Sequence, residues 1–171
     1  GLLPAVKPLP VKVLYLGWLI LFAILLVALM GMREMGRSAY RHALARPTVE
    51  EKKEHLKKAH SWDRFNPDYS FHLVRLLISE GRSRPEALDE ARAWCRQGLR
   101  LAPADAEGYQ LLSRLEGMQN QLPEAIQAAE KAVYHAPRQR DLRWELGTLY
   151  ETTGRLEAAA REYRRILNLR P

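Results

Sequence analysis

The sequence has a single cysteine, Cys95, and this scarcity excludes several classes of protein. One thiol cannot form an internal disulfide framework, and it is too few for a zinc finger or an iron–sulfur site. The chain also lacks a glycine-rich phosphate loop, a G-x-S-x-G nucleophile elbow and a paired-carboxylate motif. The sequence therefore predicts no catalytic residue, no metal site and no cofactor.

The titratable side chains do not form a recognisable site either. A histidine pair that binds a metal on one helix is typically four residues apart, whereas His55 and His60 are five apart and diverge by about 140°. The other histidines are scattered along the chain, at His42, His72 and His135. Six glutamates fall on predicted helices beside basic residues and are expected on solvated faces with occasional ion pairs: Glu86, Glu90, Glu124, Glu130, Glu157 and Glu162.

The net charge of +7 is unevenly distributed. Residues 1–47 have six basic and one acidic side chain, a net charge of +5, whereas the remaining 124 residues have 21 basic and 19 acidic side chains, a net charge of +2. A nucleic-acid-binding domain needs a basic stripe on its folded face. The charge distribution therefore predicts no nucleic-acid partner and points to a membrane surface near the N-terminal segment.

One long apolar segment lies in that N-terminal part. Residues 13–32 contain no charged side chain, and a helix of 20 residues is about 30 Å long, the thickness of the hydrocarbon core of a bilayer. Tyr15 and Trp18 lie near its start, where an aromatic belt is expected. We therefore predict a transmembrane helix. A signal peptide is the alternative, but its apolar core would be unusually long and no small-x-small cleavage site precedes the basic flank.

A basic helix is expected to continue from this span over residues 33–47. Its membrane-surface arginines, Arg33, Arg37 and Arg41, recur every fourth residue and share one face, where they are expected to contact lipid headgroups or, alternatively, a specific lipid or partner. Met35, Ala39, Ala43 and Leu44 are expected on another side. Because this flank is more basic than the N-terminal one, the positive-inside rule favours a cytoplasmic C-terminal side, with a periplasmic side as the alternative.

Beyond Pro47 the sequence predicts repeated helical hairpins. Thr48 and Glu51 form a capping box that begins the next helix. Prolines at the predicted hairpin ends are 36, 34 and 34 residues apart, at Pro67, Pro103, Pro137 and Pro171. Asn120 and Gly154, also 34 residues apart, occupy the turns within the last two units. The predicted organisation is a Pro-rich linker (1–12), a transmembrane helix (13–32), a basic helix (33–47), a half repeat (48–67), an irregular repeat (68–103) and two regular repeats (104–137 and 138–171).

The last unit resembles a tetratricopeptide repeat (TPR). It has the leucine, glycine and tyrosine of the first helix, the turn glycine, the small and aromatic residues of the second helix and the closing proline, at Leu146, Gly147, Tyr150, Gly154, Ala159, Tyr163 and Pro171. The preceding unit matches less completely, because Ser113 replaces the glycine and Glu116 the tyrosine. The resemblance implies an all-α fold, in which one transmembrane helix precedes a right-handed solenoid of about three TPR hairpins and a half repeat.

Two more specific resemblances concern the order of the parts. An anchor helix that runs directly into such repeats is similar to bacterial inner-membrane adaptors of the lipopolysaccharide assembly protein B type. A final span followed by repeats also resembles the tail of O-antigen ligase-like membrane enzymes, whose catalytic loops would precede Gly1. The first resemblance implies an adaptor without catalysis, and the second implies an accessory region of a glycan-transferring enzyme. A small subunit of a larger membrane complex is a third possibility.

The expected function is to bind a protein partner at a bacterial inner membrane. By the family's pattern, the groove lined by the first helices receives His72, Leu76, Gln110, Arg114, Trp144, Thr148 and Glu151. Trp144 and Arg114 are the strongest candidates because their residue types are enriched at binding hot spots, although Trp144 fits inter-repeat packing equally well. The face around Leu156, Ala160 and Leu167 lacks a capping helix and is a second candidate contact, covered by further chain or by a partner.

Overall fold

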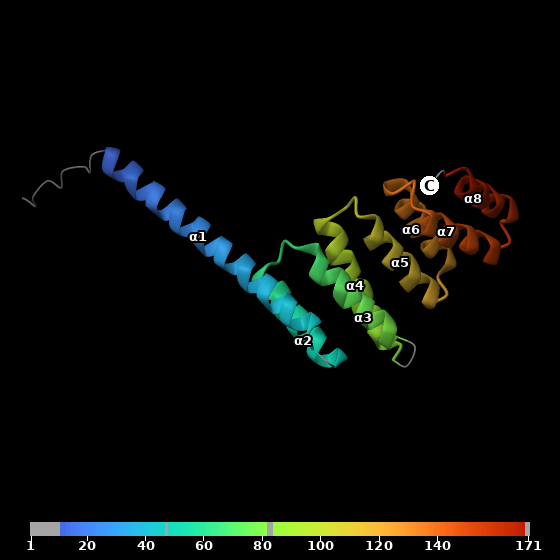
Figure 1. Cartoon of the computed structure of the whole chain (residues 1–171), viewed down its shortest axis with the longest axis horizontal. Helices are drawn as coiled ribbons and strands as arrows, with labels where there is room; N and C mark the ends of the chain where they lie inside the picture. Colours follow the sequence, from blue (N-terminus) through green and yellow to red (C-terminus); the bar gives the residue numbers. More distant parts are fainter. Residues whose placement is uncertain (1–10, 47, 82–83, 170–171) are drawn as a thin grey trace, which may run out of the picture.

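The computed structural model describes residues 11–46, 48–81 and 84–169, and within these ranges the chain forms eight α-helices and no β-strand (Figure 1). The helices are α1 (Val11–Leu44), α2 (Val49–Trp62), α3 (Pro67–Glu80), α4 (Glu86–Leu101), α5 (Ala106–Met118), α6 (Leu122–His135), α7 (Arg140–Thr152) and α8 (Leu156–Asn168). The predicted all-α fold is confirmed. The linker predicted for residues 1–12 falls outside the described residues, except for Val11 and Lys12, which begin α1.

Consecutive helices pair into four hairpins over the described part of the chain. α1 packs on α2, α3 on α4, α5 on α6 and α7 on α8, and each hairpin also contacts the next one through α2 and α3, α4 and α5, or α6 and α7. Figure 1 shows the hairpins in a row, with the N-terminal part of α1 projecting away from them. The molecule is therefore a solenoid of helical hairpins with one long helix extending from its first unit.

The first hairpin differs from the sequence prediction. The segment predicted as a half repeat, residues 48–67, contains α2, the second helix of a hairpin, and the C-terminal end of α1 supplies its first helix. The sequence prediction assigns that end of α1 to a separate basic helix. Ala39 and Ala43 of α1 are buried in two small clusters, one with Ala59 and Tyr69 and the other with Leu56 and Leu73. α1 thus contributes to a core that also contains α2 and α3.

Small residues allow this close approach of α1 to α2. A Cβ atom at Gly36 would lie 2.9 Å from the Cβ atom of Asp63 and 3.2 Å from the carbonyl oxygen of Ala59, so a larger residue would displace one of the helices. Gly36, Ala39 and Ala43 recur at three- and four-residue steps and form the buried face. The expectation that Met35 and Leu44 share this face is wrong, because both side chains are exposed.

From Tyr15 to Met35, no side chain of α1 is buried against the rest of the described chain. The large apolar side chains from Tyr15 to Met32 are exposed. The stretch Tyr15–Leu44 has a mean hydropathy of 2.4 in its most apolar window, which is sufficient by length and composition for a helix that crosses a membrane. A signal sequence near an N-terminus can meet the same two criteria.

The linkers between hairpins show that the repeat lengths predicted from the proline spacing are partly wrong. Asp63, Ala102 and Ala136 each end a second helix with nearly the same backbone angles, and each is followed three residues later by the residue that precedes the next helix. In this register Arg64 matches Pro103 and Pro137, whereas Pro67 is already the first residue of α3. The hairpins are therefore 39 and 34 residues apart rather than 36 and 34.

The longer repeat has a simple cause. Compared with the α5–α6 hairpin, the α3–α4 hairpin has one more residue in its first helix, two more in its turn and two more in its second helix. The short turns of the last two hairpins use left-handed residues, with φ of 58° at Asn120 and 74° at Gly154, as the sequence predicts. The N-cap at Thr48 is also confirmed, since its hydroxyl accepts a hydrogen bond from the Glu51 amide at 3.3 Å.

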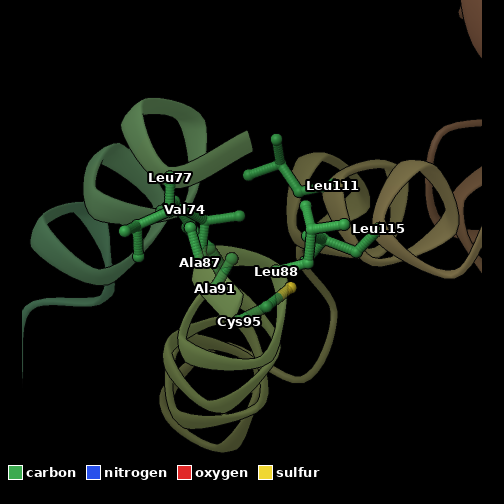
Figure 2. Packing of buried hydrophobic residues seen from close by; sticks show 9 residues of the cluster. Val74, Leu77, Ala87, Leu88, Ala91, Cys95, Leu111 and Leu115 are labelled. Atoms are coloured by element: carbon green, nitrogen blue, oxygen red, sulfur yellow. The ribbon is translucent and has the colours of Figure 1, made fainter. Parts of the chain in front are cut away.

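Apolar side chains from three helices form the largest buried cluster. Figure 2 shows Val74 and Leu77 of α3 and Leu111 and Leu115 of α5 converging above α4. From α4 the cluster receives Ala87, Leu88, Ala91 and Cys95. Because the cluster joins one hairpin to the next, burial of apolar surface between repeats stabilises the solenoid.

The packing of α1 on α2 generates the first testable prediction. We expect the G36V variant to destabilise the solenoid by about 1–3 kcal/mol, because the new side chain overpacks the contact with Asp63 and Ala59. The matched control is G31V, since a Cβ atom at Gly31 meets nothing within 4 Å. Thermal unfolding followed by circular dichroism in mild detergent measures both. Equal midpoints for G36V and G31V would contradict the packing described.

Candidate partner-binding surface

Polar side chains connect the first helices of successive hairpins. Arg75 of α3 pairs with Glu107 of α5. Gln110 of α5 donates a hydrogen bond to Glu145 of α7 at 2.9 Å, and Arg114 of α5 pairs with the same carboxylate. We call the face that runs along α3, α5 and α7 the inner surface. Glu145 is its central acceptor, because it receives two donors from the neighbouring hairpin.

Two of the seven residues predicted for the groove, Gln110 and Arg114, thus share one acceptor, Glu145. Sequence reasoning missed Glu145, Arg75 and Glu107, which are paired on the same surface. Arg75 is adjacent to Leu76, which was predicted for the groove. The position of Arg75 opposite α5 depends on how α3 and α5 are aligned, and this alignment follows from the register of the linkers rather than from the proline spacing. Glu145 adjoins Trp144 in sequence, and a charged residue beside a candidate hot spot was the one available signal.

His72 and Leu76 lie at the other end of the inner surface, next to α1. The Nε2 atom of His72 is 2.6 Å from the Tyr40 hydroxyl, which binds α3 to the end of α1. Both His72 and Leu76 line a cavity of about 220 Å³ that also borders Ala43, Leu44, Lys52, Leu56 and Arg75. Burial lowers the pKa of His72, the nearby Arg75 lowers it further and Asp68 opposes the shift. The imidazole is therefore neutral at pH 7.

Trp144, Thr148 and Glu151 lie at the last hairpin. The Trp144 side chain is 61% exposed, and its ring centroid is 5.2 Å from that of Tyr163 in α8. The Tyr163 hydroxyl donates to Glu151 at 3.0 Å, whereas the Thr148 hydroxyl donates to the Trp144 carbonyl in its own helix at 3.0 Å. The ring contact of Trp144 with Tyr163 is thus within one hairpin rather than between repeats, and most of the indole is accessible.

Three further ion pairs hold helices together and are buried or nearly so. Lys53 contacts Glu80 at 2.9 Å between α2 and α3, and Arg92 contacts Glu116 at 2.7 Å between α4 and α5. Glu162 of α8 accepts from Arg143 of α7 at 2.6 Å. The expectation of a solvated face is therefore wrong for Glu162. Removing one partner of such a pair leaves an uncompensated buried charge, so these pairs are structural.

The described residues contain no group of three or more His, Cys, Asp or Glu side chains arranged to hold a metal ion. Cys95 is fully buried, and its thiol donates to the Gly108 carbonyl at 3.3 Å. Burial, with Glu116 adding to it, raises the pKa of the Cys95 thiol to about 12. A thiol with this pKa stays protonated near neutral pH, so Cys95 acts as a packing residue of the core.

The predicted membrane-surface arginines are at the end of α1 nearest the solenoid. Arg37 forms an exposed pair with Glu34 at 2.8 Å, Arg41 is exposed, and Arg33 lines a cleft between α1 and the α2–α3 linker. At the opposite end of the solenoid, Leu156, Ala160 and Leu167 of α8 are exposed. The uncovered apolar face predicted there is present in the described chain.

Comparison with known proteins identifies the hairpins. Residues 141–171 match the tetratricopeptide repeat family model, which covers α7 and α8 from Asp141 onward. Solved TPR structures superpose on a much longer part of the chain. TTC0263, a thermophilic TPR protein of Thermus thermophilus, aligns with a TM-score of 0.65 at 18% identity, over 82% of this chain and 73% of its own. The chain has the tetratricopeptide repeat fold.

Two other solved structures have the same arrangement of helices. The crystal structure of MamA aligns with a TM-score of 0.62 at 18% identity, over 82% of this chain and 77% of its own. YrrB, a TPR protein with an unusual peptide-binding site, aligns with a TM-score of 0.58 at 19% identity, over 72% of this chain and 61% of its own. No curated protein matches the sequence significantly. At these identities the structural similarity establishes the fold.

Proposed function

We propose that this chain is a membrane-anchored TPR scaffold that binds a segment of a protein partner on its inner surface. The TPR fold is typical of protein-interaction scaffolds, and the observation that carries the proposal is the composition of this surface. It contains Glu145, which receives Gln110 and Arg114 from the neighbouring hairpin, and the adjacent residue of the same helix, Trp144, is an exposed tryptophan. Tryptophan and arginine are enriched at binding hot spots.

The pairs on the inner surface can exchange partners at little cost. Arg114 is largely exposed, and solvent-exposed ion pairs contribute only about 0.2–1 kcal/mol. A bound peptide can therefore replace the contact between Arg114 and Glu145 with its own carboxylate or amide. The printed description of YrrB as a TPR protein with a peptide-binding site supports the same kind of ligand for this chain. The proposed partner is an extended segment or a single helix with both polar and apolar side chains.

The proposed anchor is the apolar part of α1. Its exposed large side chains and its mean hydropathy of 2.4 suit a bilayer, and Arg33, Arg37 and Arg41 follow where headgroups would begin. A membrane span fits better than a cleaved signal sequence, because α1 continues without a break into the first hairpin. By the positive-inside rule we place the solenoid on the cytoplasmic side of a bacterial inner membrane.

The binding proposal predicts the effect of two substitutions. We expect W144A and R114A each to reduce recovery of bound partner at least about tenfold, since hot-spot residues contribute about 2 kcal/mol or more. The measurement is quantitative mass spectrometry of proteins that co-purify with the full chain in mild detergent. Y134A is the matched control, because Tyr134 of α6 is 80% exposed but lies outside the inner surface. Unchanged recovery with W144A, in a protein with wild-type helical content, would remove Trp144 from the site.

The orientation is tested separately in a bacterial host. With the solenoid in the cytoplasm, protease added to intact spheroplasts should leave residues 48–171 uncut, because the bilayer separates the enzyme from its substrate. Digestion should follow when the membrane is permeabilised with detergent, and a periplasmic marker protein should be digested in both samples. Cleavage of the solenoid in intact spheroplasts would place it on the periplasmic side.

A further inference from the structure

A cleft of about 970 Å³ separates α1 from the linker that joins α2 to α3. One wall is the last apolar turns of α1, and the other is the end of α2 with the whole linker. Figure 1 shows this linker beside α1, where α1 leaves the solenoid. The lining residues are Leu26, Leu29, Met30, Met32 and Arg33 of α1 and residues 61–67.

The linker in this cleft differs from the two equivalent linkers of the chain. Its third residue is Phe65, where the others have Ala104 and Arg138, and its second residue is Arg64, where the others have proline. The Phe65 side chain is 83% exposed, and Trp62, in the preceding turn, is 37% exposed. Of the three equivalent linkers, the one beside the apolar helix is the one that exposes a large aromatic side chain. This difference indicates that the linker contacts an apolar medium.

The lining combines the two chemistries of an amphiphile. Leu26, Leu29 and Met30 provide an apolar wall, and Trp62 and Phe65 line the cleft from the side of α2 and the linker. The lining also includes two arginines, Arg33 and Arg64, and one acidic residue, the buried Asp63. The net charge of the lining is therefore positive. Arginine is well suited to phosphate, because its planar group donates two parallel hydrogen bonds.

We propose that this cleft binds one anionic phospholipid of the bilayer. Its acyl chain lies along Leu26 to Met30 under the aromatic side chains, and its phosphate is held by Arg33 and Arg64. This inference rests on the proposed membrane anchor, because only a spanning α1 places Arg33 at the boundary between hydrocarbon and headgroups. A lipid in this position would fix the angle between the solenoid and the membrane plane.

The cleft size and position agree with this ligand. Small-molecule sites typically have volumes of about 300–1,000 Å³, which accommodates a phosphate headgroup and part of an acyl chain. Residues 13–32 span about 30 Å as a helix, so the cleft begins inside the hydrocarbon and ends at the headgroups. A wholly apolar ligand would leave Arg33 and Arg64 without an anionic partner. A water-soluble ligand would leave the apolar wall of the cleft without a partner.

The test uses tryptophan fluorescence and brominated lipids, which quench nearby indoles. The chain has four tryptophans. One protein keeps Trp62 alone (W18F, W94F, W144F), and a reference protein keeps Trp18 alone (W62F, W94F, W144F). Both are placed in nanodiscs of phosphatidylcholine with a minority of phosphatidylglycerol. The bromine is on one lipid or the other, and the comparison is made at equal fractions of brominated lipid.

We expect brominated phosphatidylglycerol to quench Trp62 more strongly than brominated phosphatidylcholine, with the anionic lipid enriched about fivefold at the cleft. Adding R33Q and R64Q should remove this difference, whereas R96Q with R161Q, two exposed arginines on α4 and α8, should leave it unchanged. Equal quenching of Trp62 by both lipids would overturn the proposed site, because it would show an aromatic side chain in the interface without a selective lipid.

The Trp18 protein separates this failure from that of the anchor. Quenching of Trp18 by both lipids without a selective effect at Trp62 would retain the anchor and remove the lipid site, whereas an unquenched Trp18 would overturn both. A second measurement needs no tryptophan substitutions. Native mass spectrometry should show phosphatidylglycerol retained by the wild-type chain and lost from the R33Q/R64Q variant, and equal retention would also contradict the proposal.

Discussion

The packing of three small residues of α1 against α2 determines how this molecule is assembled. Gly36, Ala39 and Ala43 allow the two helices to approach closely enough for Leu56, Ala59 and Tyr69 to be buried. As a result the last turns of α1 are the first helix of the solenoid. The apolar part of α1 and the TPR hairpins are joined by one continuous helix rather than by a linker. A partner bound on the inner surface would therefore have a defined orientation relative to the proposed membrane.

The regular part of the fold could be predicted from the sequence because its signals are local. The 34-residue spacing of the last two units, with Asn120 and Gly154 in the turns, reflects backbone conformations that few residues adopt. The role of α1 could not be predicted in the same way. Its buried face consists of glycine and alanine among arginines, which gives a weak hydrophobic period, and Met35 and Leu44 suggested the wrong side. The proline spacing also gave a wrong length for the first repeat, because Pro67 begins a helix whereas Pro103 and Pro137 precede one.

The candidate site shows a similar division. The family pattern selected Gln110 and Arg114 because such positions lie on the first helices, and the structure places both on one carboxylate. It could not select Glu145, since a contact between α5 and α7 depends on how two hairpins are stacked. The cleft beside α1 could not be predicted from the sequence either. Its arginines, Arg33 and Arg64, are 31 residues apart and belong to segments whose proximity follows only from the first hairpin.

The most direct test of this arrangement is the stability of two shortened chains. Residues 34–171 keep the end of α1, whereas residues 48–171 lack it and expose Leu56, Ala59, Tyr69 and Leu73. Urea unfolding of both, followed by circular dichroism, compares their free energies of unfolding. We predict that the shorter chain is less stable by about 3 kcal/mol or more, because burial of each large apolar side chain contributes about 1.5–3 kcal/mol. Equal stability of the two chains would show that α1 is not part of the solenoid.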